Sequence, residues 1–228
     1  MNNTITSKHL NLPLCDGQAC PAFHASSSES TTGIVLLHDC WGLSQHSIEI
    51  AENFAAAGYS VLLPDLYRNQ HPSTQGEADG MMDALDWYAA AAYVVPAAQL
   101  YLAGSCSKVV VLGLSMGSGI ALLAATMHEA IDAYALFYGL PPLLDLDFGN
   151  ISAPIQGHFV AVEENDTWCP ASRVNQFLSI LKEQNQSIEM HWYHDATHGF
   201  MNHRKPEMYC ASTCEIATQR TLSFFESL

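Results

Sequence analysis

Ser115 is the residue whose surroundings most directly suggest chemistry. It is the centre of Gly113-Leu114-Ser115-Met116-Gly117, after four apolar residues and before a run of small apolar ones. A serine on a tight turn between a buried strand and a helix needs small neighbours, because the backbone there folds close on itself. The turn puts the serine Oγ at a helix N-terminus, where the dipole stabilises negative charge on oxygen. The pattern indicates a nucleophile, and its alternative is a glycine-rich turn between two core elements.

A serine nucleophile needs a general base, and the base needs a carboxylate that orients it. We predict His198, in the segment HDATHGF after the last predicted strand, as the base; His194 is a weaker candidate because it lies closer to the strand. We predict Asp166, in the segment EENDTWCP after the preceding strand, as the carboxylate. The alternatives are a loop histidine without a role and a merely solvated aspartate. The competing carboxylates are Glu163, Glu164 and Asp195.

Two backbone N–H groups are expected to bind the oxyanion that forms when the serine attacks a carbonyl. One is that of Met116, directly after the nucleophile, and the other comes from the loop after an early strand. That loop is HDCWGLS, residues 38–44, and its N–H donor is predicted to be Cys40. Trp41 next to it either forms a wall of the substrate pocket or belongs to the core.

Apolar runs alternate with helical patterns along the chain, which predicts an α/β protein with a mostly parallel sheet covered by helices on both faces. Active residues of such sheets lie on loops at the carboxyl ends of the strands. We predict strands over 33–38, 59–63, 108–112, 131–138, 155–162 and 187–193, and an N-terminal hairpin over 5–14 and 18–24. We predict helices over 47–57, 81–103 with an interruption or restart at Pro96, 118–127, 171–184 and 212–227, and loops over 69–80 and 139–153.

Size and composition limit the possible functions. We predict one domain over residues 1–228. The chain has eight Lys and Arg residues and 23 Asp and Glu residues, which gives it a net charge of −15 at pH 7. Nucleic acid and anionic membranes are therefore not expected as partners. The chain has neither a membrane-spanning apolar stretch nor a signal-peptide pattern, so a cytoplasmic protein is expected.

The seven cysteines are expected to be free thiols. The eleven histidines have no metal-site spacing, and neither a metal nor an organic cofactor is expected.

Three segments together resemble the dienelactone hydrolase family of the α/β-hydrolase superfamily. They are GIVLLHDCWGLSQHSIEIAENFAAAGYSVLLPDLYRNQ, VVVLGLSMGSGIALLAA and HDATHGFMN, and the resemblance extends over nearly the whole chain. It implies an α/β-hydrolase fold of about eight strands without a large lid. It also supports Ser115, Asp166 and His198 as the catalytic residues, in the chain order expected of the superfamily.

The chain departs from the family's name-giving enzymes in three respects. Those enzymes carry a cysteine nucleophile, where this chain has Ser115, and a glutamate in the early loop, where it has Asp39. They hold a substrate carboxylate with two arginines. One falls at Asn202 here, and the segment that would supply the other, residues 70–82, contains no Lys or Arg. Arg204 and Lys205 could compensate only in part. Because bidentate arginine clamps are the strongest means of recognising a carboxylate, we predict that this protein does not prefer dienelactone.

These observations predict a serine hydrolase for a neutral or weakly polar carboxylic ester or lactone, acting as a monomer or homodimer on a small molecule. Asp39, Trp41 and Asn202 are the predicted pocket residues, and the alternative for Asp39 is a hydrogen bond to the backbone of its loop. The first alternative is another acyl hydrolase on the same residues, such as a thioesterase, a peptidase or a C–C hydrolase. The second is a non-catalytic protein that binds a small molecule on the same scaffold.

Overall fold

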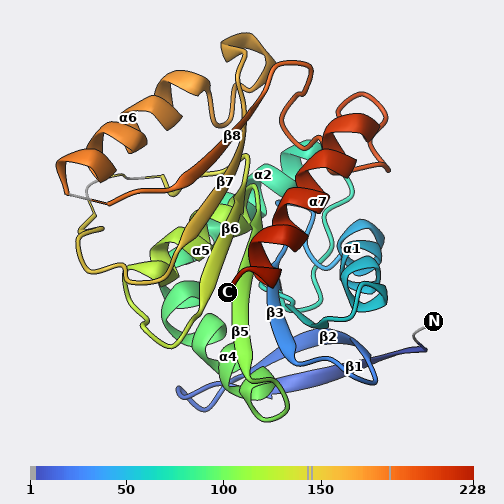
Figure 1. Cartoon of the computed structure of the whole chain (residues 1–228). Coiled ribbons are helices and arrows are strands. Elements are labelled where there is room, and N and C mark those ends of the chain that lie inside the picture. Colours follow the sequence, from blue (N-terminus) through green and yellow to red (C-terminus); the bar gives the residue numbers. More distant parts are fainter. Residues whose placement is uncertain (1–3, 143, 145, 185) are drawn as a thin grey trace.

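Eight strands form one sheet in the order β1-β2-β4-β3-β5-β6-β7-β8, which confirms the predicted fold class (Figure 1). The computed structural model describes residues 4–142, 144, 146–184 and 186–228. The pairs β1–β2 and β2–β4 are antiparallel, and the other five pairs are parallel. The strands are β1 (Ile5–Pro13), β2 (Ala19–Ser27), β3 (Thr32–Leu37), β4 (Ser60–Pro64), β5 (Lys108–Leu114), β6 (Ala133–Phe137), β7 (Ile155–Val160) and β8 (Glu189–Tyr193).

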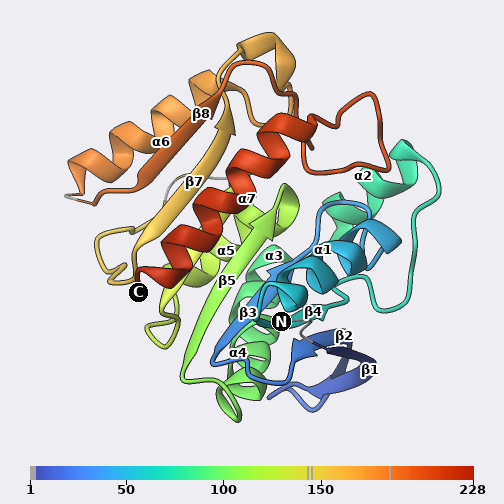
Figure 2. The same ribbon diagram turned by 45° about the vertical axis from the view of Figure 1, so that its right-hand side comes forward.

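Helices cover both faces of this sheet (Figure 2). Helices α1 and α7 lie on one face, and α4, α5 and α6 lie on the other. Along β5, Val109 and Val111 pack in the core beneath α4 and α5, whereas Val110 and Leu112 pack in the core beneath α1 and α7. An unbroken apolar run is therefore what a strand buried on both faces requires. The helices are α1 (Gln45–Ala56), α2 (Gln75–Ala84), α3 (Trp87–Ala89), α4 (Val95–Ala103), α5 (Met116–Ala125), α6 (Ala171–Glu183) and α7 (Ala211–Glu226).

The prediction of a loop over 69–80 is wrong from residue 75 onward, because α2 begins there. Thr74 accepts a hydrogen bond from the N–H of Glu77, and the Glu77 carboxylate accepts one from the N–H of Thr74. This capping box is readable in the sequence as Thr-x-x-Glu. The helix shows little apolar periodicity because Ala78 is its one buried residue. Its start therefore follows from the cap and not from packing.

Pro96 does not end the helical segment that contains it. A π-helical turn over Ala90–Val94 joins α3 to α4, and the N–H of Val95 bonds to the carbonyl oxygen of Ala90. Proline lacks an N–H and its ring clashes with the preceding turn of a regular α-helix. The wider turn just before Pro96 lets the chain continue to Ala103. The break in the predicted helix comes instead at Leu85 and Asp86, between α2 and α3.

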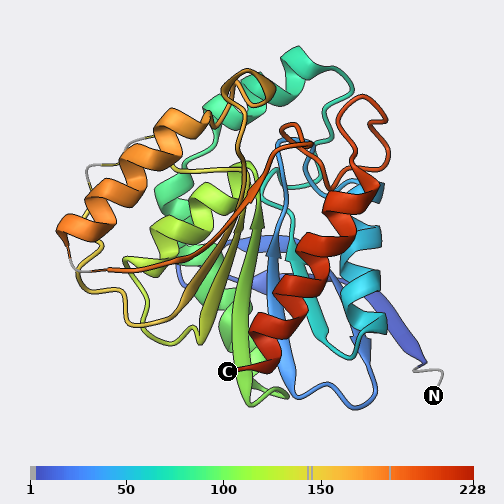
Figure 3. The ribbon, with the colours of Figure 1, turned by 45° about the horizontal axis from the view of Figure 1, so that its top comes forward.

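The carboxyl ends of the parallel strands meet at one edge of the sheet. Helix α2 and the segments that follow β7 and β8 lie over this edge (Figure 3). The predicted nucleophile, base and carboxylate all belong to segments that start there. Among the described helices, none combines the length and the apolar character needed to cross a membrane.

Gly139, just after β6, is a position where the fold tolerates no side chain. A Cβ on Gly139 would overlap the backbone carbonyl of Ser115, whereas a Cβ on Gly80, in the middle of α2, would meet nothing. We expect Gly139→Ala to lower the free energy of unfolding by about 2 kcal/mol or more, because backbone must move. Gly80→Ala should raise it by up to about 1 kcal/mol, because glycine disfavours a helix interior.

Urea unfolding of the two variants and the wild type measures both changes. Equal stability of the Gly139→Ala variant and the wild type would contradict the close approach of the two segments.

Candidate active site

Ser115 lies on a sharp turn between β5 and α5. Its backbone is in an unusual region for a non-glycine residue, with φ 50° and ψ −113°. The N–H of Ser115 donates to the carbonyl oxygen of Phe137, 2.9 Å away. A Cβ on Gly117 would overlap the carbonyl of Leu37 at the end of β3, so only glycine fits there. Helix α5 begins at Met116, two residues before the predicted start, and Ser115 is therefore its N-terminal flanking residue.

Ser115, His198 and Asp166 form a continuous chain of hydrogen bonds. Ser115 Oγ lies 2.7 Å from His198 Nε2, and His198 Nδ1 lies 2.9 Å and 3.0 Å from the two carboxylate oxygens of Asp166. A carboxylate can only accept here, so Nδ1 carries the proton and Nε2 is free to accept the hydroxyl proton of Ser115. The side chain of Asp166 is completely buried and that of His198 is 13% exposed. The arrangement can therefore remove a proton from Ser115 while Asp166 holds the imidazole in place.

Backbone groups fix the Asp166 carboxylate. Its Oδ1 also accepts hydrogen bonds from the N–H groups of Trp168, at 3.1 Å, and Cys169, at 2.7 Å. The N–H of His198 in turn bonds to the carbonyl oxygen of Asn165 at 3.2 Å. The segments after β7 and β8 are thus joined to each other, and the position of the imidazole depends on both.

The competing residues lie elsewhere. His194 and Asp195 are exposed. The Glu163 carboxylate accepts hydrogen bonds from the backbone N–H and the hydroxyl of Ser172, at the start of α6. Glu164 is also exposed. Of the carboxylates considered, the structure brings Asp166 to His198.

His38 positions the loop that follows β3. Its Nε2 accepts the N–H of Leu66, at 3.1 Å, so its Nδ1 carries the proton and donates to the carbonyl oxygen of Asp39, at 2.7 Å. Burial lowers the pKa of His38, which keeps the ring neutral. The loop then carries Cys40 to the cavity next to Ser115. Burial raises the pKa of the Cys40 thiol to about 12, so its side chain is neutral.

Asp39 is a second buried carboxylate, and it lines the same cavity as His198. Its Oδ1 accepts the N–H of Trp41 at 2.9 Å. Burial raises the pKa of Asp39 to about 6, against the opposing effects of this hydrogen bond and of the charges on His198 and Lys205. Asp39 therefore changes charge within the range in which a histidine titrates, and it lines the same cavity as Ser115.

The cations near the site are already engaged. The guanidinium of Arg204 forms an ion pair with Glu49, whose other oxygen lies 2.9 Å from His203 Nε2. Lys205 Nζ lies 3.9 Å from the centre of the Trp41 ring. Asn202 is buried, and its side-chain oxygen accepts the N–H of Arg204 at 3.1 Å.

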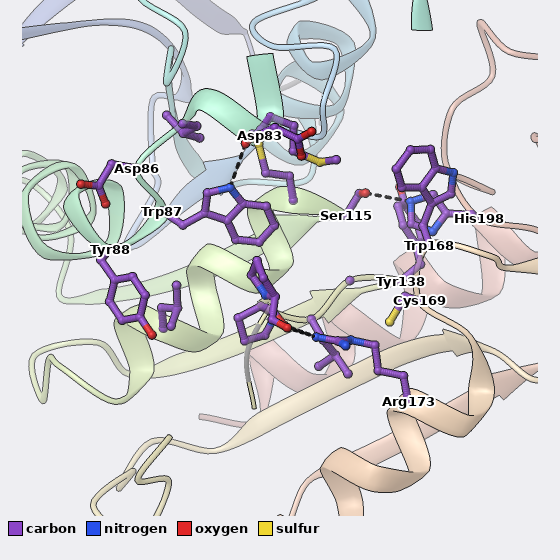
Figure 4. Close-up of a pocket in the computed structure, with 18 residues that line it drawn as sticks. Asp83, Asp86, Trp87, Tyr88, Ser115, Tyr138, Trp168, Cys169, Arg173 and His198 are labelled. Carbon is purple, nitrogen blue, oxygen red and sulfur yellow. Dashed lines mark hydrogen bonds between the residues drawn. The ribbon is translucent and has the colours of Figure 1, made fainter. Parts of the chain in front are cut away.

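Two cavities meet at Ser115 and His198. The larger has a volume of about 540 Å³ and the smaller one of about 30 Å³. Trp87 faces Ser115 from one side of the larger cavity, and Trp168 lies beside His198 on the other (Figure 4). The predicted pocket residues Asp39, Trp41 and Asn202 line the smaller cavity.

Tyr138, Trp87, Trp168 and Arg173 line the larger cavity and were not among the predicted site residues. Tyr138 follows β6 with φ 39°, and its ring centre lies 5.1 Å from that of His198. Burial raises the pKa of Tyr138 well above its ordinary value, so the phenol is neutral. The sequence contained a signal for Tyr138, because this residue lies at the carboxyl end of a predicted strand, where active-site residues are expected.

The Arg173 guanidinium donates to the carbonyl oxygens of Pro141 and Pro142, a contact across the fold that no local pattern indicates.

Within residues 4–142, 144, 146–184 and 186–228, no three His, Cys, Asp or Glu side chains are grouped so as to hold a metal ion. All seven cysteines are free thiols.

An eight-stranded, mostly parallel sheet with a hydrogen-bonded serine, histidine and aspartate at its edge defines an α/β-hydrolase fold. The chain belongs to the dienelactone hydrolase family, whose sequence model matches residues 20–228. This confirms the family resemblance seen in the sequence, and the family is one of hydrolases.

Related proteins agree with this assignment. The chain is 26% identical to the carboxymethylenebutenolidase of Rhodococcus opacus over 230 residues, covering 90% of this chain and 85% of that protein. It is 26% identical to protein usf of Aquifex pyrophilus over 206 residues, covering 85% and 87%. The crystal structure of a candidate dienelactone hydrolase from Klebsiella pneumoniae superposes with a TM-score of 0.86 at 20% identity, covering 99% of this chain and 100% of that one.

The raised pKa of Asp39 makes stability depend on pH. The unfolded value of 3.8 lies below the folded value of about 6, so the folded state loses stability as pH rises through this range. We expect the Asp39→Asn variant to lack this loss, since an amide can still accept the Trp41 N–H. Between about pH 4 and about pH 7, the unfolding free energy of the variant should rise relative to that of the wild type by about 3 kcal/mol. This is the free energy that corresponds to a pKa shift of about two units.

Urea unfolding at a series of pH values tests this, with Glu163→Gln as the control. The hydrogen bonds from Ser172 lower the pKa of Glu163, so the wild type gains stability from this carboxylate as pH rises. The Glu163→Gln variant lacks that gain and should therefore lose stability relative to the wild type as pH rises, which is the opposite of the change expected for Asp39→Asn. A constant difference between Asp39→Asn and the wild type would contradict the buried position of Asp39.

Proposed function

We propose that this protein is a serine hydrolase that cleaves a carboxylic ester or lactone through an acyl-enzyme intermediate. The observation that carries the proposal is the chain of hydrogen bonds from Ser115 through His198 to Asp166. Membership of a hydrolase family and the cavities that open at Ser115 support it.

The proposed reaction has two halves. His198 Nε2 takes the proton of Ser115 as Oγ attacks the carbonyl carbon, and Asp166 stabilises the imidazolium that forms. The N–H groups of Cys40 and Met116 bind the oxyanion. When the tetrahedral intermediate collapses, the C–O bond to the alcohol breaks and His198 gives the alcohol its proton. A water molecule then attacks the acyl-enzyme with His198 as the base, which releases the acid and restores Ser115.

The charges around the cavities support a neutral substrate. The family's carboxylate-binding arginine positions hold Asn202 or lack a cation, and Arg204 is paired with Glu49. Lys205 lies over Trp41, and Asp39 adds a carboxylate when it ionises. In the larger cavity an anionic acyl group would meet Asp83 and Asp86, and Arg173 there already donates to the carbonyl oxygens of Pro141 and Pro142.

The direct test of the proposal is removal of the nucleophile. Ser115→Ala should lower kcat for p-nitrophenyl acetate by about a thousandfold or more and abolish labelling by a fluorophosphonate, because both reactions need Oγ. Ser107→Ala, at the other end of β5, is the matched control and should keep wild-type rates and labelling. Full activity in the Ser115→Ala variant would refute the assignment.

A substrate comparison tests the bond and the charge. We expect kcat/KM for a neutral methyl ester to exceed that for dienelactone by about tenfold or more, because the substrate carboxylate finds no clamp here. Thioester and amide analogues of the same acyl group belong in the same panel. Faster turnover of either analogue would favour the thioesterase or peptidase alternative, and a preference for dienelactone would contradict the argument from charge.

A further inference from the structure

A helical segment on the surface of this acidic chain carries no charge. Residues 87–107 contain no Asp, Glu, Lys, Arg or His, in a chain whose net charge is −15. Helix α5 is also uncharged, but there all ten residues are buried. The segment that contains α3, the π-helical turn and α4 is different, because one of its sides is exposed. Burial therefore does not explain its lack of charge.

The inner side of this segment packs on the sheet, and its outer side faces the solvent. Ala91, Val95 and Leu102 belong to the hydrophobic core. On the outer side, the exposed fraction is 43% for Tyr93 and 73% for Leu100, which is the largest for a large apolar side chain among the described residues. A continuous apolar surface of this kind on a soluble protein indicates an interaction site.

The sizes of the side chains on the outer side are symmetric about the middle of the segment. Tyr93 and Leu100 are seven residues apart, which is about two helical turns, so they lie on the same side. Shorter side chains lie between them and beyond them: Pro96 and Ala97 in the middle, and Ala89 and Gly104 at the two ends. Two such segments can pack antiparallel about a twofold axis at the middle, so that the large residues of each copy meet those of the other and the short ones leave room for them.

Charge favours a second copy of the chain as the occupant of this surface. Two molecules with a net charge of −15 repel each other, and an uncharged contact avoids placing like charges side by side. The same net charge disfavours an anionic membrane. Because the pattern of sizes is symmetric, one surface serves both copies, as a twofold contact requires.

We propose that this protein forms a homodimer through the outer sides of two antiparallel α3–α4 segments, with Tyr93 of each copy against Leu100 of the other. The contact extends over roughly 23 Å of helix, from Ala89 to Gly104. Such a contact lies at the lower end of the size range for specific interfaces, so we expect a dissociation constant on the order of 10 μM. Residues other than Tyr93 and Leu100 line the cavities at Ser115, so the proposal does not depend on the proposed function.

Sedimentation equilibrium of the full chain tests the dimer. Between about 1 and about 200 μM, the mean mass of the wild type should rise from 24.9 kDa toward twice that value. Leu100→Glu should raise the dissociation constant by about a hundredfold, because it buries two unpaired carboxylates in each dimer. Ile216→Glu is the matched control and should leave the constant unchanged, since Ile216 is 44% exposed on α7, on the other face of the sheet (Figure 2).

A wild type that remains monomeric over this range would overturn the proposal, and so would a Leu100→Glu variant that dimerises like the wild type. Cosedimentation of a monomeric wild type with phosphatidylcholine vesicles would assign the surface to lipid instead. A melting curve shows whether each variant folds, and Ala97→Glu places the charge at the twofold axis if Leu100→Glu does not fold.

An exchange of charges tests the antiparallel pairing. Tyr93→Lys combined with Leu100→Glu places a lysine of each copy opposite a glutamate of the other. Within one copy the two side chains are about two turns apart, too far to pair. We expect the double variant to dimerise about tenfold more tightly than Leu100→Glu alone, whereas Tyr93→Lys alone should dimerise less tightly than the wild type. Equal affinity of the double variant and Leu100→Glu would overturn the pairing of Tyr93 with Leu100.

Discussion

The positive-φ backbone at Ser115 is held in place by three main-chain contacts of the turn. The N–H of Ser115 bonds to Phe137 at the end of β6, Gly117 lies against Leu37 at the end of β3, and Gly139 lies against Ser115 itself. A non-glycine residue in such a conformation costs about 1–3 kcal/mol, which the surrounding structure must offset. Here the ends of β3 and β6 supply that support. The orientation of Oγ toward His198 therefore depends on the whole central sheet and not on the turn alone.

Two buried carboxylates, Asp166 and Asp39, belong to the site of His198 and differ in their hydrogen bonds. Asp166 accepts two backbone N–H groups and the imidazole N–H, which replace the water it loses. Asp39 accepts the N–H of Trp41, and burial raises its pKa to about 6. The same residue type is thus held by three N–H donors in one place and by one in the other, and burial raises the pKa of the carboxylate with one donor.

The family fold leaves substrate choice to the segments around the strand ends. Helix α2 buries Ala78 alone, yet its residues line both cavities. Arg204 forms an ion pair with Glu49, and Lys205 lies over the Trp41 ring. These two cations therefore stabilise the loop and contribute little free charge to the pocket. A chain can in this way keep the strands, the turn at Ser115 and the histidine loop of its family while the walls around them change.

The sequence by itself determined the parallel sheet, because consecutive apolar residues are what two-sided burial requires, and with it the edge to which Ser115, Asp166 and His198 belong. It also contained the cap of α2 in Thr74 and Glu77, a signal that the weak apolar periodicity hid. Only the tertiary structure decided that Asp166 and not Glu163 meets the imidazole, that Tyr138 and Trp168 border it, and that one cavity at Ser115 is much larger than the other. These features arise from contacts between segments far apart in the chain, and local spacing carries no information about which side chains such contacts bring together.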